Sequence, residues 1–277
     1  MKKTRIAPTP SGFLHAGNAF NFLLTDRLAK ATGSKVVLRI DDLDAERTRP
    51  EYLEDIFRSL DWLGVTLDVG PSGVEDFRTS WSQQLRLDRY TVLVDELRGK
   101  GVLYPCACSR QHFERFTHDT HACRSGSSEV GPTAWRLRIP VPCPIEVKQI
   151  AGMTERVDLA ASLPDPVIAQ RDTGRPAYQI ASLSDDLDMG ITWIIRGADL
   201  LDSTACQLHL AQVLDRPAFG AVLFHHHPLT ADAQGQKLSK SAGSTSLKAM
   251  REAGGSPGHL IRQAEDYSEA LLKHLAP

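Results

Sequence analysis

Two short segments near opposite ends of the chain constrain its fold more than any other feature. The first is Arg5-Ile6-Ala7-Pro8-Thr9-Pro10-Ser11-Gly12-Phe13-Leu14-His15-Ala16-Gly17-Asn18, and the second is Lys237-Leu238-Ser239-Lys240-Ser241. The first predicts a strand end, a Pro/Gly loop and then a helix, which points backbone N–H groups and a positive helix end at an anion. The second places two lysines where a loop can bring positive charge onto a phosphate chain. Together they predict a nucleotide-binding site.

The totals narrow the class of protein. The chain has 277 residues and a formal net charge of −2, which argues against a broad, sequence-blind nucleic-acid binder but leaves a local basic face possible. The N-terminal residues lead straight into a strand, and charged residues or glycine interrupt the longest apolar runs, so we expect a cytoplasmic protein that does not enter a membrane. Five cysteines is an odd number, which disfavours a disulfide framework and favours metal binding or free thiols.

The apolar pattern predicts an α/β fold. A strand at 4–7, a helix from Ala16 to Gly33 and a strand at 36–40 form a parallel crossover unit. The remaining predicted elements are helices at 51–63, 82–98 and 203–214, strands at 178–183, 191–195 and 221–224, and two short helices in the last thirty residues. Between Gly101 and Pro166 the helical period disappears. We therefore expect residues 1–100 and 167–277 to form two halves of one catalytic domain, with 101–166 as an inserted module.

Cysteine and histidine gather inside the predicted insertion. Cys106, Cys108 and Cys123 flank the segment His118–His121. Thiolate and imidazole ligands suit tetrahedral zinc, and the alternative is a group of unpaired buried thiols. Cys206 lies in a predicted helix and is expected in the core. The tract His225–His227 continues a strand, where adjacent side chains point to opposite faces, so we do not expect it to hold one metal ion.

The two terminal segments resemble the HIGH and KMSKS signatures of class I aminoacyl-tRNA synthetases. The run Arg-x-Ala-Pro-x-Pro-x-Gly-x-Leu-His narrows the resemblance to the glutamyl/glutaminyl branch, and two stretches beginning at Ala177 and Arg196 resemble the branch's second-half signatures. The resemblance runs from Arg5 to about Ser241. It implies a class I Rossmann-type parallel sheet with an inserted zinc-bearing module.

The same resemblance assigns roles to individual residues. It implies that His15 and Lys240 are catalytic and that ATP, with Mg²⁺, is bound by His15, Gly17, Asn18, Lys237 and Lys240. The fourth HIGH position is Asn18 rather than histidine, and its amide can still donate hydrogen bonds. The residues that the resemblance places at a glutamate substrate are Arg5, Ile6, Ala7, Pro8, Thr9, Asp41, Tyr178 and Arg196.

Two further positions depart from the family pattern. Asp41 stands where the branch usually has a glutamate near the amino group of the amino acid, and its side chain is one methylene shorter. For the neighbouring Asp42 and Asp44, an acidic loop and a functional role remain equally open. Related truncated synthetases carry Cys-x-Cys followed by Tyr-x-x-x-Cys, whereas Asp119 occupies the tyrosine position here. Ligand chemistry favours His121 as the fourth ligand, ahead of Asp119 and His118.

The chain ends soon after the lysine loop, so we expect no anticodon-binding domain. That architecture resembles the glutamyl-queuosine tRNA(Asp) synthetases, which implies activation of glutamate with ATP and its transfer to queuosine in the tRNA(Asp) anticodon by a monomer. Two alternatives stay open. One is glutamylation of another acceptor, such as a tRNA 3′ end or a non-tRNA molecule. The other is a non-catalytic paralogue that binds RNA or nucleotide.

Overall fold

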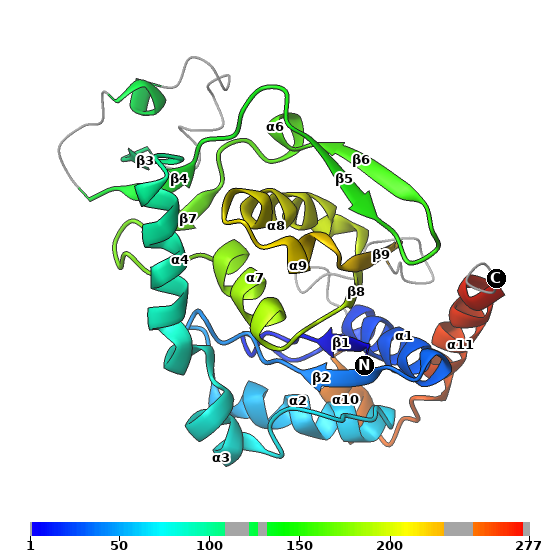
Figure 1. Ribbon diagram of the computed structural model, residues 1–277. Coiled ribbons are helices and arrows are strands. Elements are labelled where there is room, and N and C mark those ends of the chain that lie inside the picture. Colours follow the sequence, from blue (N-terminus) through cyan, green and yellow to red (C-terminus); the bar gives the residue numbers. More distant parts are fainter. Residues whose placement is uncertain (1, 109–121, 127–131, 230–245, 274–277) are drawn as a thin grey trace.

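The computed structural model describes residues 2–108, 122–126, 132–229 and 246–273 (Figure 1). Parallel strands lie at its centre. β1 (Lys3–Ile6) pairs with β2 (Lys35–Leu38), and β8 (Trp193–Gly197) pairs with β9 (Leu223–His227). β1 also runs beside β8, where the Thr192 backbone N–H donates to the Lys3 carbonyl over 2.9 Å. The expected α/β class is confirmed, but in the described residues the parallel strands form two small sheets rather than one continuous sheet.

The helices of the first half lie close to their predicted positions. α1 (Ala16–Thr32) connects β1 to β2 and ends at Gly33, whose φ of 62° is the left-handed conformation that glycine adopts without strain. α2 (Pro50–Leu63) follows. The helix predicted at 82–98 begins as a 3-10 turn at Gln83–Arg86 and becomes α4 (Leu87–Gly99). A short helix, α3 (Val74–Asp76), precedes that turn.

One sequence prediction in the second half is wrong. The segment 178–183, expected as a strand, begins the helix α7 (Tyr178–Asp188). Every residue from Ile180 to Asp186 is buried, so the helix has no continuous polar face at this point. A short buried run does not distinguish strand from helix by periodicity, which explains the error. The next helices are α8 (Leu201–Val213) and α9 (Pro217–Gly220).

The described part of 101–166 contains mostly antiparallel strands. β3 (Leu103–Cys106) and β4 (Ala134–Leu137) join β7 (Val167–Ala169) in one sheet. β5 (Pro144–Lys148) and β6 (Thr154–Asp158) form a hairpin, which is followed by α6 (Leu159–Ser162). Figure 1 shows this hairpin beside α8 and β9. The Ile150 backbone N–H donates to the Phe224 carbonyl over 2.8 Å, which attaches the hairpin to β9.

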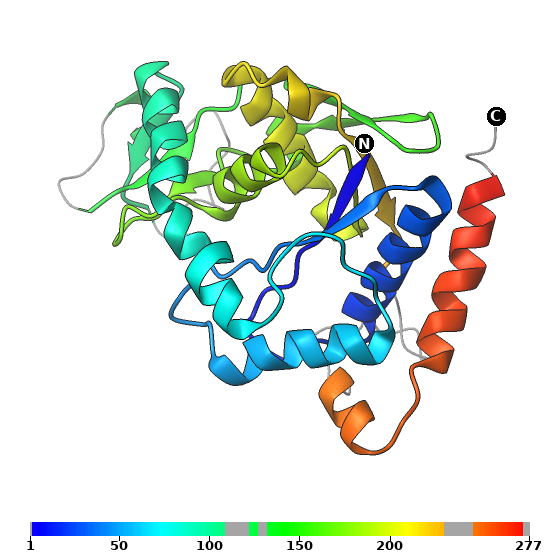
Figure 2. The same cartoon turned by 60° about the horizontal axis from the view of Figure 1, so that its bottom comes forward.

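The C-terminal helices pack on the first half of the chain. α10 (Leu247–Glu252) is short, as expected, whereas α11 (Gly258–Lys273) has 16 residues and is longer than predicted. Figure 2 shows α11 lying along α1. Among the described residues, no helix has both the length and the apolar character needed to cross a membrane.

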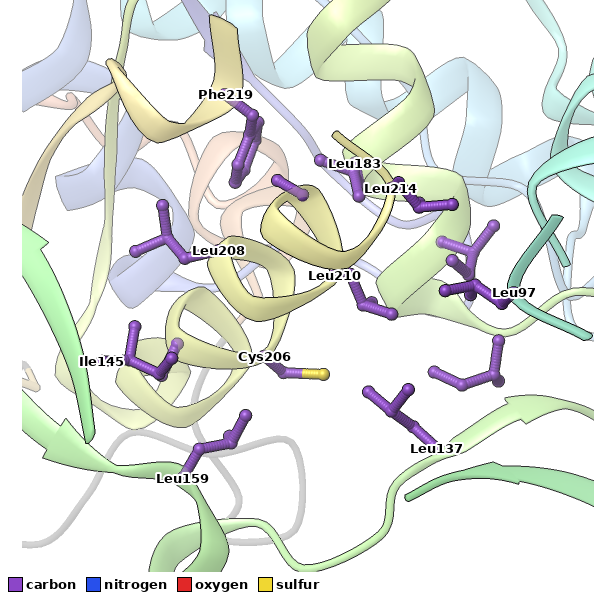
Figure 3. Packing of buried hydrophobic residues seen from close by; sticks show 14 of the residues in the cluster. Leu97, Leu137, Ile145, Leu159, Leu183, Cys206, Leu208, Leu210, Leu214 and Phe219 are labelled. Carbon is purple, nitrogen blue, oxygen red and sulfur yellow. The ribbon is translucent and has the colours of Figure 1, made fainter. Parts of the chain in front are cut away.

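Two large hydrophobic clusters form most of the core in the described residues, and a small third one surrounds Cys106. One large cluster surrounds α1 and α2, and the other surrounds α7 and α8. Figure 3 shows Cys206 on α8 in the second cluster, together with leucines of neighbouring segments such as Leu137 and Leu159. Cys206 has no exposed surface, which confirms that it is a core residue. All five cysteines lie in the described part of the chain, and none is in a disulfide there.

Candidate active site

The loop between β1 and α1 ends in a capping arrangement built from two residues of the first motif. The Gly17 backbone N–H donates to His15 Nδ1 over 3.1 Å, and the His15 backbone N–H donates to Asn18 Oδ1 over 3.0 Å. These bonds satisfy groups that a helix N-terminus otherwise leaves unpaired. Because Nδ1 accepts a hydrogen bond, the proton of the neutral His15 ring lies on Nε2. Asn18 therefore serves as a cap, a role that the sequence did not reveal.

A cavity of about 520 Å³ opens at the carboxyl ends of β1 and β8. This is the edge where open α/β sheets bind ligands. Its wall includes nine of the residues that the sequence predicts for ATP or glutamate: Arg5, Ala7, Thr9, His15, Gly17, Asn18, Asp41, Tyr178 and Arg196. The structure thus brings residues from both halves of the chain to one cavity.

Four of the predicted residues do not contribute to the described wall. Ile6 is fully buried in the core, and Pro8 is also buried. Lys237 and Lys240 lie outside the described residues. Their predicted contact with ATP therefore stays a prediction.

Two residues of the cavity wall, Arg5 and Asp41, belong to a buried charge network centred on Asp186 of α7. Asp186 Oδ1 accepts hydrogen bonds from Arg5 Nε over 3.2 Å and from Arg39 Nη1 over 2.7 Å. Arg39 also donates to both carboxylate oxygens of Asp41, over 2.7 and 3.0 Å, and to Ser182. The side chains of Arg39 and Asp186 are 1% and 0% exposed. One carboxylate thus fixes two arginines that come from different strands.

Asp41 lines the cavity, but both of its oxygens are already paired with Arg39. Burial raises the pKa of Asp41, and the neighbouring Arg39 guanidinium partly opposes that rise. Asp42 has a structural role, because its carboxylate accepts from Ser82 Oγ over 2.5 Å and from the Gln83 backbone N–H over 2.7 Å. Asp44 is exposed beside Arg47, as in an ordinary acidic loop.

Arg196, at the end of β8, is paired differently from the other two arginines. Its side chain is buried, and Nη1 donates to the amide oxygen of Gln207 over 3.1 Å. Within the described residues, its Nε and Nη2 have no hydrogen-bond partner. Burial lowers the pKa of Arg196, because few charged partners offset the desolvation of its guanidinium. The arginine can therefore still accept an anionic ligand.

The cavity wall contains further residues that the sequence did not mark as site residues: Asn21, Phe22, Gly197, Asp199, Leu200, His227 and Leu229. Asn21 lies one helical turn after Asn18, so the helical period was the signal that places it on the same face. Gly197, Asp199 and Leu200 directly follow Arg196 in the chain.

The three histidines of the tract bond to three separate neighbours. His225 Nε2 lies 3.1 Å from Tyr267 Oη, His226 Nε2 lies 2.8 Å from Thr204 Oγ1, and His227 Nε2 lies 3.1 Å from an Asn21 side-chain nitrogen. The three rings thus face different neighbours, as expected for adjacent residues of a strand. Burial lowers the pKa of His225 to about 4 and of His226 to about 3, so both rings are neutral at pH 7.

Three cysteines form a cluster that could hold a metal ion. The sulfur atoms of Cys106, Cys108 and Cys123 all lie within 4.8 Å of one another, and those of Cys108 and Cys123 are 3.8 Å apart. Tetrahedral zinc with Zn–S bonds of about 2.3 Å separates its sulfur ligands by about 3.8 Å, so the spacing fits. Burial and the neighbouring thiols raise the pKa of Cys108 to about 12, so deprotonation of the thiol is unfavourable without a cation. A bound metal ion stabilises the thiolate and removes this obstacle. The candidate fourth ligands His118, Asp119 and His121 lie outside the described residues.

Arg196 is the charged group of the cavity that is best placed to bind an anion. The wall contains two guanidinium groups, of Arg5 and Arg196, and two carboxylates, of Asp41 and Asp199. Arg5 is paired with Asp186 and Asp41 with Arg39, whereas Arg196 has no carboxylate hydrogen-bond partner among the described residues. A guanidinium with two unpaired N–H donors matches a carboxylate in both charge and geometry.

These features, two parallel strand pairs, a capped histidine loop and an arginine cavity at the strand ends, are those of a class I aminoacyl-tRNA synthetase. Residues 2–265 match the family described as tRNA synthetases class I (E and Q), catalytic domain. The chain belongs to that family and is a ligase.

Curated relatives carry more specific names. The chain is 38% identical over 256 residues to the glutamyl-Q tRNA(Asp) synthetase of Burkholderia cenocepacia (strain HI2424), covering 88% of this chain and 82% of the relative. It is 34% identical over 270 residues to glutamate–tRNA ligase 2 of Acidiphilium cryptum (strain JF-5), covering 92% of this chain and 58% of that protein.

Its fold is similar to the crystal structure of the glutamate-tRNA synthetase from Elizabethkingia anophelis. The TM-score is 0.67 at 25% sequence identity, and the match covers 91% of this chain. The chain spans about half of that solved structure, 54% of its length.

Proposed function

We propose that this chain activates glutamate with ATP and transfers the glutamyl group to the queuosine base in the anticodon of tRNA(Asp). The observation that carries the first step is the buried Arg196, whose Nε and Nη2 have no partner among the described residues and which lies in the same cavity as His15. Arg5 supplies a second guanidinium there. The glutamyl-Q tRNA(Asp) synthetase of Burkholderia cenocepacia supports the acceptor.

In the first step, an oxygen of the glutamate α-carboxylate forms a bond to the α-phosphorus of ATP, and the bond to pyrophosphate breaks. The residues act by positioning and by positive charge rather than by forming covalent bonds. The proton on His15 Nε2 and the N–H groups at the start of α1 are suited to hold phosphate oxygens. Lys237 and Lys240 would offset the charge of the departing pyrophosphate, and Mg²⁺ held by the ATP phosphates would supply further positive charge.

The amino acid is selected by the two arginines in this proposal. Arg5 and Arg196 bind its carboxylates, and the Tyr178 hydroxyl hydrogen-bonds to it. Asp41 stays paired with Arg39 and contacts the ammonium group of the amino acid directly or through a water molecule. In the second step, a hydroxyl of the acceptor attacks the activated carbonyl, an ester bond forms, and AMP leaves with the electrons of the broken mixed-anhydride bond.

Zinc, in this proposal, has a structural role. Cys106, Cys108 and Cys123 would supply three thiolate ligands, with His121 as the fourth. A closed four-ligand site stiffens a segment that has few apolar anchors. None of these three cysteines lines the cavity in which ATP and glutamate are proposed to react.

The first test is glutamate-dependent exchange of pyrophosphate into ATP by the purified chain without tRNA. Exchange is expected, because nine of the residues proposed to bind ATP and glutamate lie together in one cavity formed by this chain alone. Exchange that requires tRNA would contradict this part of the proposal.

The acceptor is tested with radiolabelled glutamate and tRNA from queuosine-containing and queuosine-deficient cells. Label is expected on the first tRNA alone. Equal labelling of both would refute queuosine as the acceptor and would favour a tRNA 3′ end.

A further inference from the structure

Within the described residues, the Arg196 guanidinium has no carboxylate hydrogen-bond partner, and the charges of Arg5, Asp186 and Arg39 act on it without such a bond. The Gln207 amide oxygen accepts its one hydrogen bond, and the Phe224 ring lies 5.7 Å from its central carbon. His226 is opposite Arg196 in the pairing of β8 with β9, and burial keeps that ring uncharged. The buried carboxylate of Asp186 is instead committed to Arg5 and Arg39.

The Gln207 side chain is fully buried on α8, one helical turn after Thr204. Arginine has only donors, so the amide must present its oxygen to Arg196 and its nitrogen to the opposite side. In the described residues, that nitrogen, Nε2, has no hydrogen-bond partner. A buried unpaired donor is unfavourable.

For hydrogen bonding within the fold alone, a glutamate would be the better residue at position 207. Its carboxylate would accept from Arg196 with full charge, and it would have no N–H group to leave unpaired. It would also neutralise Arg196, which has no carboxylate hydrogen-bond partner in the part of the chain that the structure describes. The amide holds the arginine in place without cancelling its charge.

We propose that Gln207 is a positioning residue that keeps Arg196 electrostatically available, and that it thereby sets the preference for a carboxylate side chain over an amide in the amino-acid substrate. The inference rests on the proposed function, in which Arg196 binds a substrate carboxylate. Gln207 acts through Arg196, because it does not line the cavity itself. The prediction is therefore about selectivity rather than about the chemical step.

The test uses the full chain and three variants in pyrophosphate exchange, with glutamine added as a competitor. Gln207→Glu places a competing carboxylate on Arg196. Gln207→Met keeps the volume and removes the acceptor without adding charge. Gln212→Glu makes the same charge change at an exposed position of the same helix and is the matched control.

We expect Gln207→Glu to raise the KM for glutamate roughly tenfold to hundredfold, the range for one charged hydrogen bond. The ratio of the inhibition constant for glutamine to the KM for glutamate should fall by a similar factor. The kcat of this variant should change much less. Its thermal unfolding temperature should stay the same or rise, because the buried pair is now complete. Gln207→Met should raise the KM by a smaller factor and retain the preference for glutamate. Gln212→Glu should match the parent chain.

The inference is overturned if Gln207→Glu keeps the parent's KM and glutamine discrimination, or if both Gln207 variants lower stability and leave discrimination unchanged. Should Gln207→Glu fail to fold, the KM of Gln207→Met decides, and a KM for glutamate equal to the parent's overturns the inference. The variant Arg196→Gln distinguishes failure of this inference from failure of the proposed function. A parent chain without glutamate-dependent exchange, or an Arg196→Gln variant that still discriminates, refutes the proposed function. If Arg196→Gln loses discrimination and Gln207→Glu does not, this inference alone fails.

Discussion

Replacing Asp186 by asparagine is expected to destabilise the protein far more than the same replacement two residues later. Asp186 is fully buried, and its Oδ1 accepts from both Arg5 and Arg39. Asp186→Asn preserves the size and one acceptor oxygen but removes the charge that balances two guanidinium groups. Breaking a buried ion pair costs about 3–5 kcal/mol, and the retained oxygen puts this variant at the lower end, about 3 kcal/mol. The new amide nitrogen replaces Oδ2, which has no partner in the described structure, and so gains no hydrogen bond.

Asp188 provides the control on the same helix. Its carboxylate is paired with Arg89 over 2.9 Å, but the two side chains are 45% and 65% exposed. Asp188→Asn should therefore cost no more than about 1 kcal/mol. Urea denaturation followed by tryptophan fluorescence measures both variants, with the slope m compared to confirm that only stability changed. If Asp186→Asn lowers the free energy of unfolding no more than Asp188→Asn does, the charge network does not support the cavity as argued.

Three further outcomes follow from the site. Stability should fall as pH decreases from about 6.5, because the unfolded chain protonates His225 and His226 there while the buried rings resist down to about 4 and 3. The slope is at most about 1.4 kcal/mol per pH unit for each ring, and a His226→Asn variant with unchanged pH dependence would contradict it. Elemental analysis should find one zinc ion per chain and less in Cys108→Ser, whereas a folded parent chain without metal would refute the zinc site. Asp41→Ala should raise the KM for glutamate and Asp41→Glu should not, so an Asp41→Ala variant that matches the parent would show that this residue does not meet the substrate.

The sequence predicted the cavity better than it predicted the contacts that hold it. Arg5 and Arg196 were identified because they belong to segments with a recognisable order of residues. Their partners Asp186 and Gln207 have no such local signal: Asp186 lies 181 positions after Arg5, within a helix that the apolar pattern did not distinguish from a strand. Long-range pairing of this kind depends on how the two halves of the chain pack together. The spacing of apolar residues along the sequence does not show that packing.

Asp41 illustrates the same limit at short range. The sequence placed it at the end of a strand and near a ligand, and the structure puts it on the cavity wall. Asp41 pairs through two hydrogen bonds with Arg39, which lies two residues earlier and directly after the end of β2 at Leu38. Strand alternation places residues 39 and 41 on one face, but it gives no reason for this two-bond geometry.

The two arginines that we propose to bind the substrate are held by different chemistry, and the difference has consequences for mutation. Arg5 and Arg39 share the buried carboxylate of Asp186. The contact that positions Arg5 therefore also stabilises the packing of β1 and β2 against α7. Arg196 is held by a neutral amide, so a change at Gln207 alters the charge available in the cavity while the rest of the network stays intact. A change at Asp186 should therefore reduce stability and glutamate binding together, whereas Gln207→Glu should reduce binding without reducing stability. Opposite responses at two buried partners of two neighbouring arginines would separate the part of this cavity that supports the fold from the part that selects the ligand.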